Sequence, residues 1–146
     1  MSGPAPPRLS SEMLHASTVA LGGRAVVIQG PSGSGKSDLA LRLIDRGFAL
    51  VSDDQTMISR DGPRLLASAP PTIAGKIEIR GIGIVDMAHA EAVPVALLVE
   101  LTSDIERLPD PARARSILGI DVPLISIDAA AASAAVKVAL ALERLG

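Results

Sequence analysis

The chain has 146 residues, no cysteine, two histidines and a formal net charge of −2. This length suffices for one domain with a buried core, and the lack of cysteine excludes disulfides and thiolate zinc sites. With Phe48 as the only aromatic residue and no basic surface, nucleic acid is not an expected partner. No apolar run reaches the roughly 20 residues that span a bilayer, and no signal-peptide pattern is present. We therefore expect a cytoplasmic protein without membrane contact.

The N-terminal part predicts a tail followed by a hairpin. Residues 1–10 are rich in proline and small residues and are expected to be mobile. Leu14–Leu21 is apolar and β-branched, Gly22-Gly23 supplies a turn, and Arg24–Gln29 is a second apolar run, so two paired strands are predicted. His15 would lie at the far end of this hairpin, either with a functional role or as an ordinary surface or capping residue.

The next segment, GPSGSGKS at Gly30–Ser37, fits the phosphate-loop pattern G-x-x-x-x-G-K-[ST]. Such a loop turns backbone N–H groups toward phosphate oxygens. Asp38–Arg46 consists of helix formers and Gly47 follows as a C-terminal cap, so a helix N-terminus would point at the same phosphates. The pattern therefore predicts a nucleoside triphosphate site formed by Gly30, Pro31, Ser32, Gly33, Ser34, Gly35, Lys36 and Ser37, with Lys36 on the β- and γ-phosphates and Ser37 on Mg²⁺.

An apolar strand, Phe48–Ser52, ends in the adjacent carboxylates Asp53 and Asp54. In open α/β sheets ligands bind at the carboxyl ends of strands. The pair therefore indicates a metal-orienting carboxylate or a base, and two solvated acids in a turn are the alternative. Beyond it, Thr56–Arg60 and Arg64–Ala67 predict a second hairpin.

The segment Ile77–Asp86 reads IEIRGIGIVD. Its alternation places Glu78 and Arg80 on one face of a strand. Gly81 and Gly83 permit a close backbone approach to a ligand or an unusual turn. Glu78 and Arg80 would complete a metal–phosphate site, or they form a surface ion pair.

The last third predicts two strands and a helix around an exposed connection, Thr102–Ala114. Pro94–Leu101 and Val122–Ile127 are the expected strands. Ala129–Leu145 is the expected helix, with Val136, Ala139, Leu140 and Leu142 facing the sheet. The fold class is therefore α/β, in a single domain over residues 1–146.

Four of these stretches resemble one family, the C-terminal catalytic domain of HPr kinase/phosphorylase, the serine kinase of the phosphotransferase carrier HPr. The matching residues are His15, GPSGSGKS at 30–37, LVSDD at 50–54 and IEIRGIGIVD at 77–86, with a weaker match over 104–108 and 118–124. The chain is most similar to short forms without the family's N-terminal domain.

The resemblance implies a fold and a set of roles. The sheet would be mixed and contain a P-loop, as in phosphoenolpyruvate carboxykinase. The ligands would be ATP and Mg²⁺, the partner HPr or an HPr paralogue, and the assembly a homo-oligomer, specifically a hexamer. It implies Asp54 as general base with Asp53 as its neighbour, Ser37 and Glu78 as metal ligands, and His15, Lys36 and Arg107 as further catalytic positions.

One departure from the family concerns the segment after the last strand. Family members with phosphorylase activity carry a basic loop there, whereas Ile127–Ala134 contains no lysine or arginine. An alanine run has no side chain for charge-assisted bonds to phosphate, so the kinase direction is favoured. The alternatives are a nucleotide-dependent switch and a small-molecule P-loop kinase.

Overall fold

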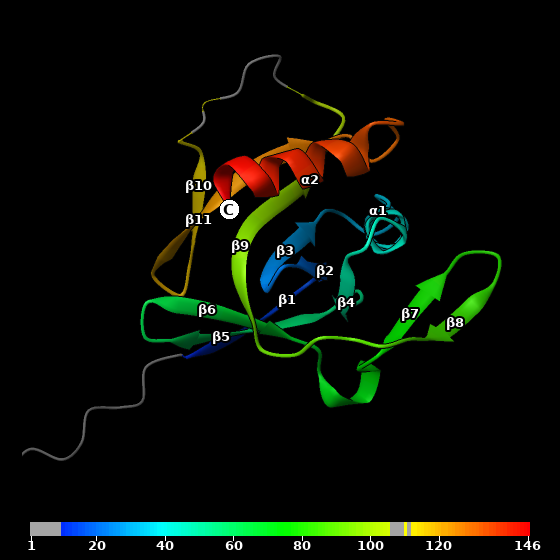
Figure 1. Cartoon of the computed structure of the whole chain (residues 1–146), viewed down its shortest axis with the longest axis horizontal. Coiled ribbons are helices and arrows are strands. Elements are labelled where there is room, and N and C mark those ends of the chain that lie inside the picture. The colour runs from blue at the N-terminus through cyan, green and yellow to red at the C-terminus, as the bar shows by residue number, and fades with distance from the viewer. Residues whose placement is uncertain (1–9, 106–109, 111) are drawn as a thin grey trace, which may run out of the picture.

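A nine-stranded mixed sheet organises the fold of the computed structural model, which describes residues 10–105, 110 and 112–146 (Figure 1). Its strands in chain order are β1 (Ser11–Leu14), β2 (Ala16–Leu21), β3 (Arg24–Gln29), β4 (Ala49–Ser52), β5 (Thr56–Asp61), β6 (Arg64–Ser68), β9 (Val93–Leu101), β10 (Ala114–Ile117) and β11 (Ile120–Ile127).

The longest strand, β9, is central to this sheet. It runs parallel to β3 on one side and to β11 on the other, and its first residues pair antiparallel with β6. From β3 the sheet continues through β2 to β4, and from β6 through β5 to β1. In this parallel alignment, three residues near the carboxyl ends of their strands are in register with one another: Gln29, Glu100 and Ser126. The predicted mixed α/β sheet is therefore confirmed.

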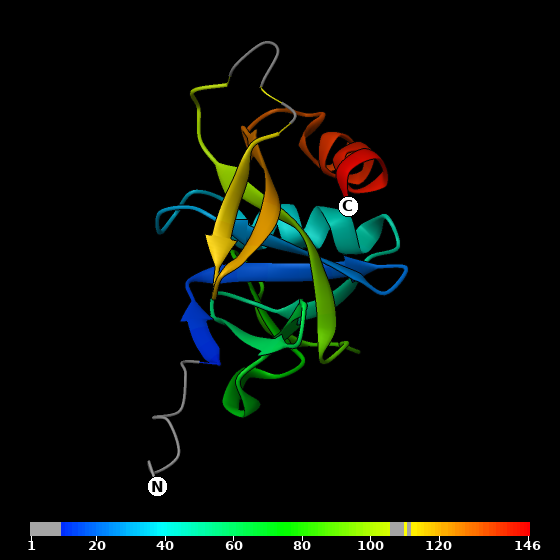
Figure 2. The same ribbon diagram turned by 90° about the vertical axis from the view of Figure 1, so that its left-hand side faces the viewer.

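Two helices, α1 (Lys36–Asp45) and α2 (Ala134–Leu145), lie on the same side of the sheet (Figure 2). Their buried side chains form one apolar core with strand residues such as Ile28 and Val99. Alternate strand residues, including Val27 and Leu98, face a second core, formed where the sheet curls toward β5 and β6. No helix in the described ranges is long and apolar enough to cross a membrane.

The hairpin of β7 (Lys76–Ile79) and β8 (Gly83–Asp86) forms a separate two-stranded sheet. A short 3-10 turn, η1 (Pro71–Ile73), precedes it. In Figure 1 this hairpin stands to the right, apart from the large sheet. The hairpin packs against the rest of the molecule through one face, where Ile77 is buried in the core beneath α1. The hairpin therefore forms a wall beside the N-terminus of α1.

The predicted boundaries of the last helix were wrong. It begins at Ala134 rather than Ala129, and the preceding alanines form turns. Val136 and Leu140 are 40% and 52% exposed, although both were expected to face the sheet. Because nearly every side chain of this segment is apolar, the sequence does not distinguish one face from another. Of the four predicted residues, Leu142 is buried and Ala139 is partly buried against the core; the buried face consists of Ala134, Ala135, Val138 and Leu142.

Strand β10 was not predicted. It pairs with the first half of β11, forming a hairpin around Leu118 and Gly119, which both have positive φ. Its sequence, ARSI, is mostly exposed and includes Arg115, so it lacks the apolar run that identified the buried strands.

Candidate functional site

The glycine-rich segment after β3 is a tight turn that leads directly into α1. Ser34 N donates to Pro31 O at 3.0 Å, and Gly35 is the N-cap residue of the helix. Gly35 has φ +99°, which L side chains rarely adopt, and a Cβ there would lie 3.2 Å from the Cβ of Ala129. The turn thus favours glycine chiefly for its backbone angle, and it packs closely against the loop after β11.

Gly30 is closely packed rather than strained in its backbone. A Cβ at this position would lie 2.5 Å from Ser34 Oγ, because the Ser34 side chain folds beneath the turn. Ser34 Oγ is buried and has no hydrogen-bond partner among the described residues. The turn therefore contains an unsatisfied polar atom, a feature that often marks functional strain or an absent ligand.

Lys36 is the first residue of α1, and its ammonium points back into the turn. Nζ donates to Gly30 O at 3.0 Å and to Pro31 O at 3.2 Å, and the residue is only 6% exposed. A buried ammonium needs such acceptors, since an unpaired charge is costly away from water. The positive charge is thus fixed at the turn, beside the N–H groups of the helix N-terminus.

The Asp53 carboxylate joins three elements beneath the turn. Oδ1 accepts a hydrogen bond from Ser37 Oγ at 2.6 Å and one from Ser17 Oγ at 2.9 Å. Oδ2 accepts from Glu78 N at 3.0 Å. This buried carboxylate therefore connects α1, β2 and β7, and its three donors offset the loss of hydration.

Asp54 lies at the surface, next to this buried carboxylate. Its Oδ1 is 2.8 Å from His15 Nε2, and the two side chains are 64% and 50% exposed. His15 occupies the bend between β1 and β2, the position predicted for it beside the end of β3. The Asp54 backbone is in the left-handed region at φ +67°, so its side chain leaves the turn in a different direction from that of Asp53.

A cleft of about 750 Å³ lies between the turn and the β7–β8 hairpin. Within the described residues no ion pair joins Glu78 to Arg80, so the predicted alternative of a surface ion pair is not what the geometry shows. Gly81 and Gly83, with φ +86° and +117°, turn the hairpin tip toward the cleft. The lining residues are Ser32, Gly33, Gly35, Lys36, Ser37, Asp38, Leu41, Asp54, Glu78, Ile79, Arg80, Gly81, Ile82 and Gly83.

Most of the predicted site residues therefore come together. Gly30, Pro31 and Ser34 support the turn without lining the cleft, and Asp53 lies buried below it. Arg107 lies outside the described residues. Ser17 was not predicted; the one available signal is that Ser17 and Thr18 are polar residues just after His15 in a strand whose other residues are apolar.

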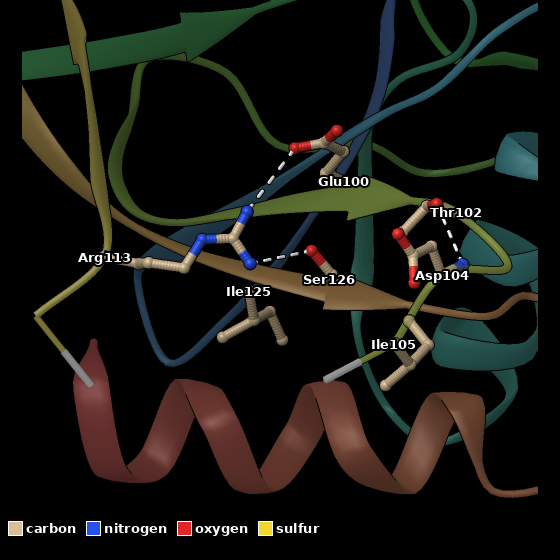
Figure 3. A pocket seen from close by; sticks show the side chains of 7 residues that line it. All are labelled: Glu100, Thr102, Asp104, Ile105, Arg113, Ile125 and Ser126. Atoms are coloured by element: carbon tan, nitrogen blue, oxygen red, sulfur yellow. Dashed lines mark hydrogen bonds and ion pairs between the residues drawn. The ribbon is translucent and has the colours of Figure 1, made fainter. Parts of the chain in front are cut away.

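A second, smaller cavity of about 360 Å³ opens near the ends of β9 and β11 (Figure 3). Arg113 reaches across it and donates to Ser126 Oγ at 2.9 Å, while Ile105 and Ile125 point toward α2. Arg115 donates to Glu100 Oε2 and to Gln29 Oε1, both at 3.0 Å. Both guanidinium groups are thus engaged by polar side chains near the ends of the central strands.

The alanine segment after β11 packs against the glycine-rich turn. Arg42 of α1 donates to Ala129 O at 2.6 Å and to Ala131 O at 3.4 Å, and its Nε lies 3.1 Å from Asp38 Oδ2. The Arg42 guanidinium is therefore already paired with backbone carbonyls and a carboxylate.

Comparison with known proteins gives a consistent result. A family model described as HPr Serine kinase C-terminal domain matches residues 8–143. The chain is 40% identical over 129 residues to an HPr kinase/phosphorylase of Chlorobium phaeobacteroides strain BS1, and 39% identical over 129 residues to one of Prosthecochloris aestuarii. Each alignment covers 80% of this chain and 38% of the relative, so the chain spans less than half the length of these proteins.

A solved structure shows the same fold. The Hpr(Ser) kinase/phosphatase from Coxiella burnetii aligns with a TM-score of 0.79 and 31% sequence identity. The alignment covers 91% of this chain and 95% of that structure.

Proposed function

Since the chain belongs to the HPr serine kinase C-terminal domain family, we propose that it transfers the γ-phosphate of ATP to a serine of an HPr-type phosphocarrier protein. One observation carries this proposal: an exposed carboxylate, Asp54, lines the same cleft as the glycine-rich turn. A nucleotide-binding module needs only the turn, whereas a transferase also needs a group that accepts the proton of the attacking hydroxyl.

The turn at residues 30–37 is the triphosphate-binding part of the cleft. Its backbone N–H groups and the α1 N-terminus favour negative charge, and Lys36 is held at the same place. On binding, the ammonium exchanges the carbonyls of Gly30 and Pro31 for phosphate oxygens. We further propose that this turn and the mixed sheet represent the P-loop fold of the phosphoenolpyruvate carboxykinase type.

The donor set near the turn fits Mg²⁺. Ser37 Oγ donates its proton to Asp53, which leaves the oxygen lone pairs free to face a cation. Glu78 adds a carboxylate from the opposite wall of the cleft. Mg²⁺ typically takes one or two carboxylates together with substrate phosphates and waters, as this set allows. When bound, the ion would neutralise charge on the β- and γ-phosphate oxygens.

Transfer then depends on positioning and proton removal. Asp54 accepts the proton of the serine hydroxyl while the serine oxygen bonds to the γ-phosphorus and the bond to ADP breaks. His15, 2.8 Å from the Asp54 carboxylate, orients it. Arg80 lines the cleft and can contact phosphate oxygens, and Arg107 is proposed to stabilise the charge on the transferred group.

Replacing the proposed metal ligand Glu78→Gln should raise the Mg²⁺ concentration needed for half-maximal activity by about tenfold or more. One charge-assisted interaction is lost, and about 1.4 kcal/mol corresponds to a factor of ten. A magnesium titration of transfer activity measures this effect. Glu143→Gln, an exposed change on α2, is the matched control. Unchanged magnesium dependence of Glu78→Gln would remove Glu78 from the metal site.

The reverse reaction, phosphate-dependent removal of the phosphoryl group, should be weak. The segment beside the turn presents alanines, and the nearby Arg42 is engaged by Asp38 and two backbone carbonyls. Compared with a site that holds phosphate by two charge-assisted bonds, each worth about 1.5–3 kcal/mol, this segment should lower the rate of the reverse reaction by at least two orders of magnitude. We expect pyrophosphate release from seryl-phosphorylated HPr, millimolar phosphate and Mg²⁺ to be slower than the forward reaction by about that factor.

A gain-of-function variant sharpens this test. Ala130 and Ala132 are exposed members of the segment, so arginines fit there without entering the core. The double variant Ala130→Arg/Ala132→Arg should release pyrophosphate faster than the parent at an unchanged kinase rate. A parent that already releases pyrophosphate at its forward rate would show that another basic group holds the phosphate.

The proposal itself is tested by incubating the purified protein with γ-labelled ATP, Mg²⁺ and an HPr-type carrier. Label on a serine of the carrier supports it. Label on a small molecule, or nucleotide binding without transfer, would instead favour a small-molecule kinase or a nucleotide switch.

A further inference from the structure

Ser17 of β2 contacts both residues of the Asp53–Asp54 pair, which follows the end of β4. It is completely buried and pairs with Ile28 of β3. Its Oγ donates to Asp53 Oδ1 at 2.9 Å and accepts a hydrogen bond from Asp54 N at 3.1 Å. One hydroxyl thus acts as donor and acceptor at the same time, toward two successive residues.

The second of these bonds matters because the Asp54 backbone is unusual. Its φ of +67° lies in the left-handed region, which only a few per cent of non-glycine residues adopt. Such a conformation persists only when its surroundings fix it. The peptide N–H of Asp54 has Ser17 Oγ as its hydrogen-bond acceptor, so this hydroxyl fixes the direction in which the carboxylate leaves the turn.

The first bond has less influence on the neighbouring carboxylate. Asp53 keeps two further donors, Ser37 Oγ and Glu78 N, when the Ser17 hydroxyl is removed. Loss of Ser17 Oγ should therefore leave the nucleotide and metal side of the cleft assembled. It should disturb the Asp54 side, where His15 would be the one hydrogen-bond partner left to the carboxylate among the described residues.

We propose that Ser17 is a positioning residue for phosphoryl transfer, acting through the backbone of Asp54 without touching nucleotide or acceptor. The inference rests on the proposed role of Asp54 as the base. It predicts a selective effect on the transfer step, whereas a purely structural serine would affect stability alone.

The test compares Ser17→Ala with Thr18→Val. Thr18 is the adjacent buried residue, and its hydroxyl bonds Thr56 Oγ1 at 2.9 Å, just beyond the same turn, without contacting either carboxylate. We expect Ser17→Ala to lower kcat for transfer about tenfold with the KM for ATP within about twofold of the parent, as for one lost buried hydrogen bond. Both variants should lower Tm, but Thr18→Val should leave kcat within about twofold. If Ser17→Ala does not fold, Ser17→Cys takes its place, because its sulfur is only a weak acceptor for the Asp54 N–H.

A double-mutant cycle with Asp54→Asn separates this proposal from the proposed function. If Ser17 acts through the base, Ser17→Ala should cost about tenfold in the parent and almost nothing in the Asp54→Asn protein. An equal loss in both backgrounds, or no loss in folded Ser17→Ala, would overturn the positioning role. A parental rate in Asp54→Asn alone would instead overturn the base assignment on which the inference rests.

Discussion

Lys36→Ala is expected to abolish detectable ATP hydrolysis and phosphoryl transfer while the protein stays folded. The ammonium is nearly buried, and its two hydrogen bonds go to carbonyls of the glycine-rich turn rather than to the core. Its removal deletes the charge proposed to contact the β- and γ-phosphates and loosens the turn. Because each charge-assisted bond contributes about 1.5–3 kcal/mol, the affinity for Mg·ATP should also fall by about tenfold or more.

Calorimetric titration with Mg·ATP and a transfer assay measure these two effects. Lys137→Ala is the matched control, since Lys137 is exposed on α2 and does not line the cleft. If Lys36→Ala bound and turned over ATP like the parent, the turn would not be the triphosphate site.

Asp54→Asn is expected to retain Mg·ATP binding and to lose transfer by about 100-fold or more, the range for a lost general base. Asparagine has nearly the same shape as aspartate. In the parent, His15 Nε2 lies 2.8 Å from the Asp54 carboxylate, and the asparagine side-chain oxygen can still accept a hydrogen bond from it. The backbone at φ +67° also tolerates asparagine. The substitution therefore removes basicity while conserving the geometry.

Single-turnover transfer at saturating Mg·ATP measures this loss directly. Asp121→Asn, an exposed change on β11, is the control for a general effect of lost charge. Similar small losses in Asp54→Asn and in Glu78→Gln would argue against separate roles for base and metal ligand.

The parts of the site that the sequence predicted are the local ones. A strand, a glycine-rich turn and a helix follow without a gap, so the position of Lys36 results from a continuous segment. Asp54 and Glu78 were predicted at strand ends or on a strand face, and both line the cleft. Each position depends on the pattern of its own neighbours, which a single sequence displays.

Contacts between residues far apart in the chain could not be predicted from such local patterns. The bonds from Ser17 to residues 53 and 54 depend on the pairing of β2 with β4, so they join positions 36 and 37 residues apart. The orientation of α2 was mispredicted, because an alanine-rich helix carries little directional information. The packing of Ala129 beside Gly35 likewise appears only when β11 and α1 are brought together.

Four expectations from the sequence are not tested by the contacts within this chain. The single-domain organisation, the cytoplasmic location and the homo-oligomer stay predictions, and so does the role of Arg107. Assembly depends on complementary surfaces between copies, which no local motif encodes.

Identification of the phosphorylated residue tests the central claim most directly. An HPr-type carrier, and a variant of it whose acceptor serine is replaced by alanine, are incubated with the protein and Mg·ATP and analysed by mass spectrometry. We predict a single phosphoserine on the carrier, none on the alanine variant, and at least a 100-fold slower appearance with Asp54→Asn. An unmodified carrier in the presence of protein that binds Mg·ATP would contradict the account.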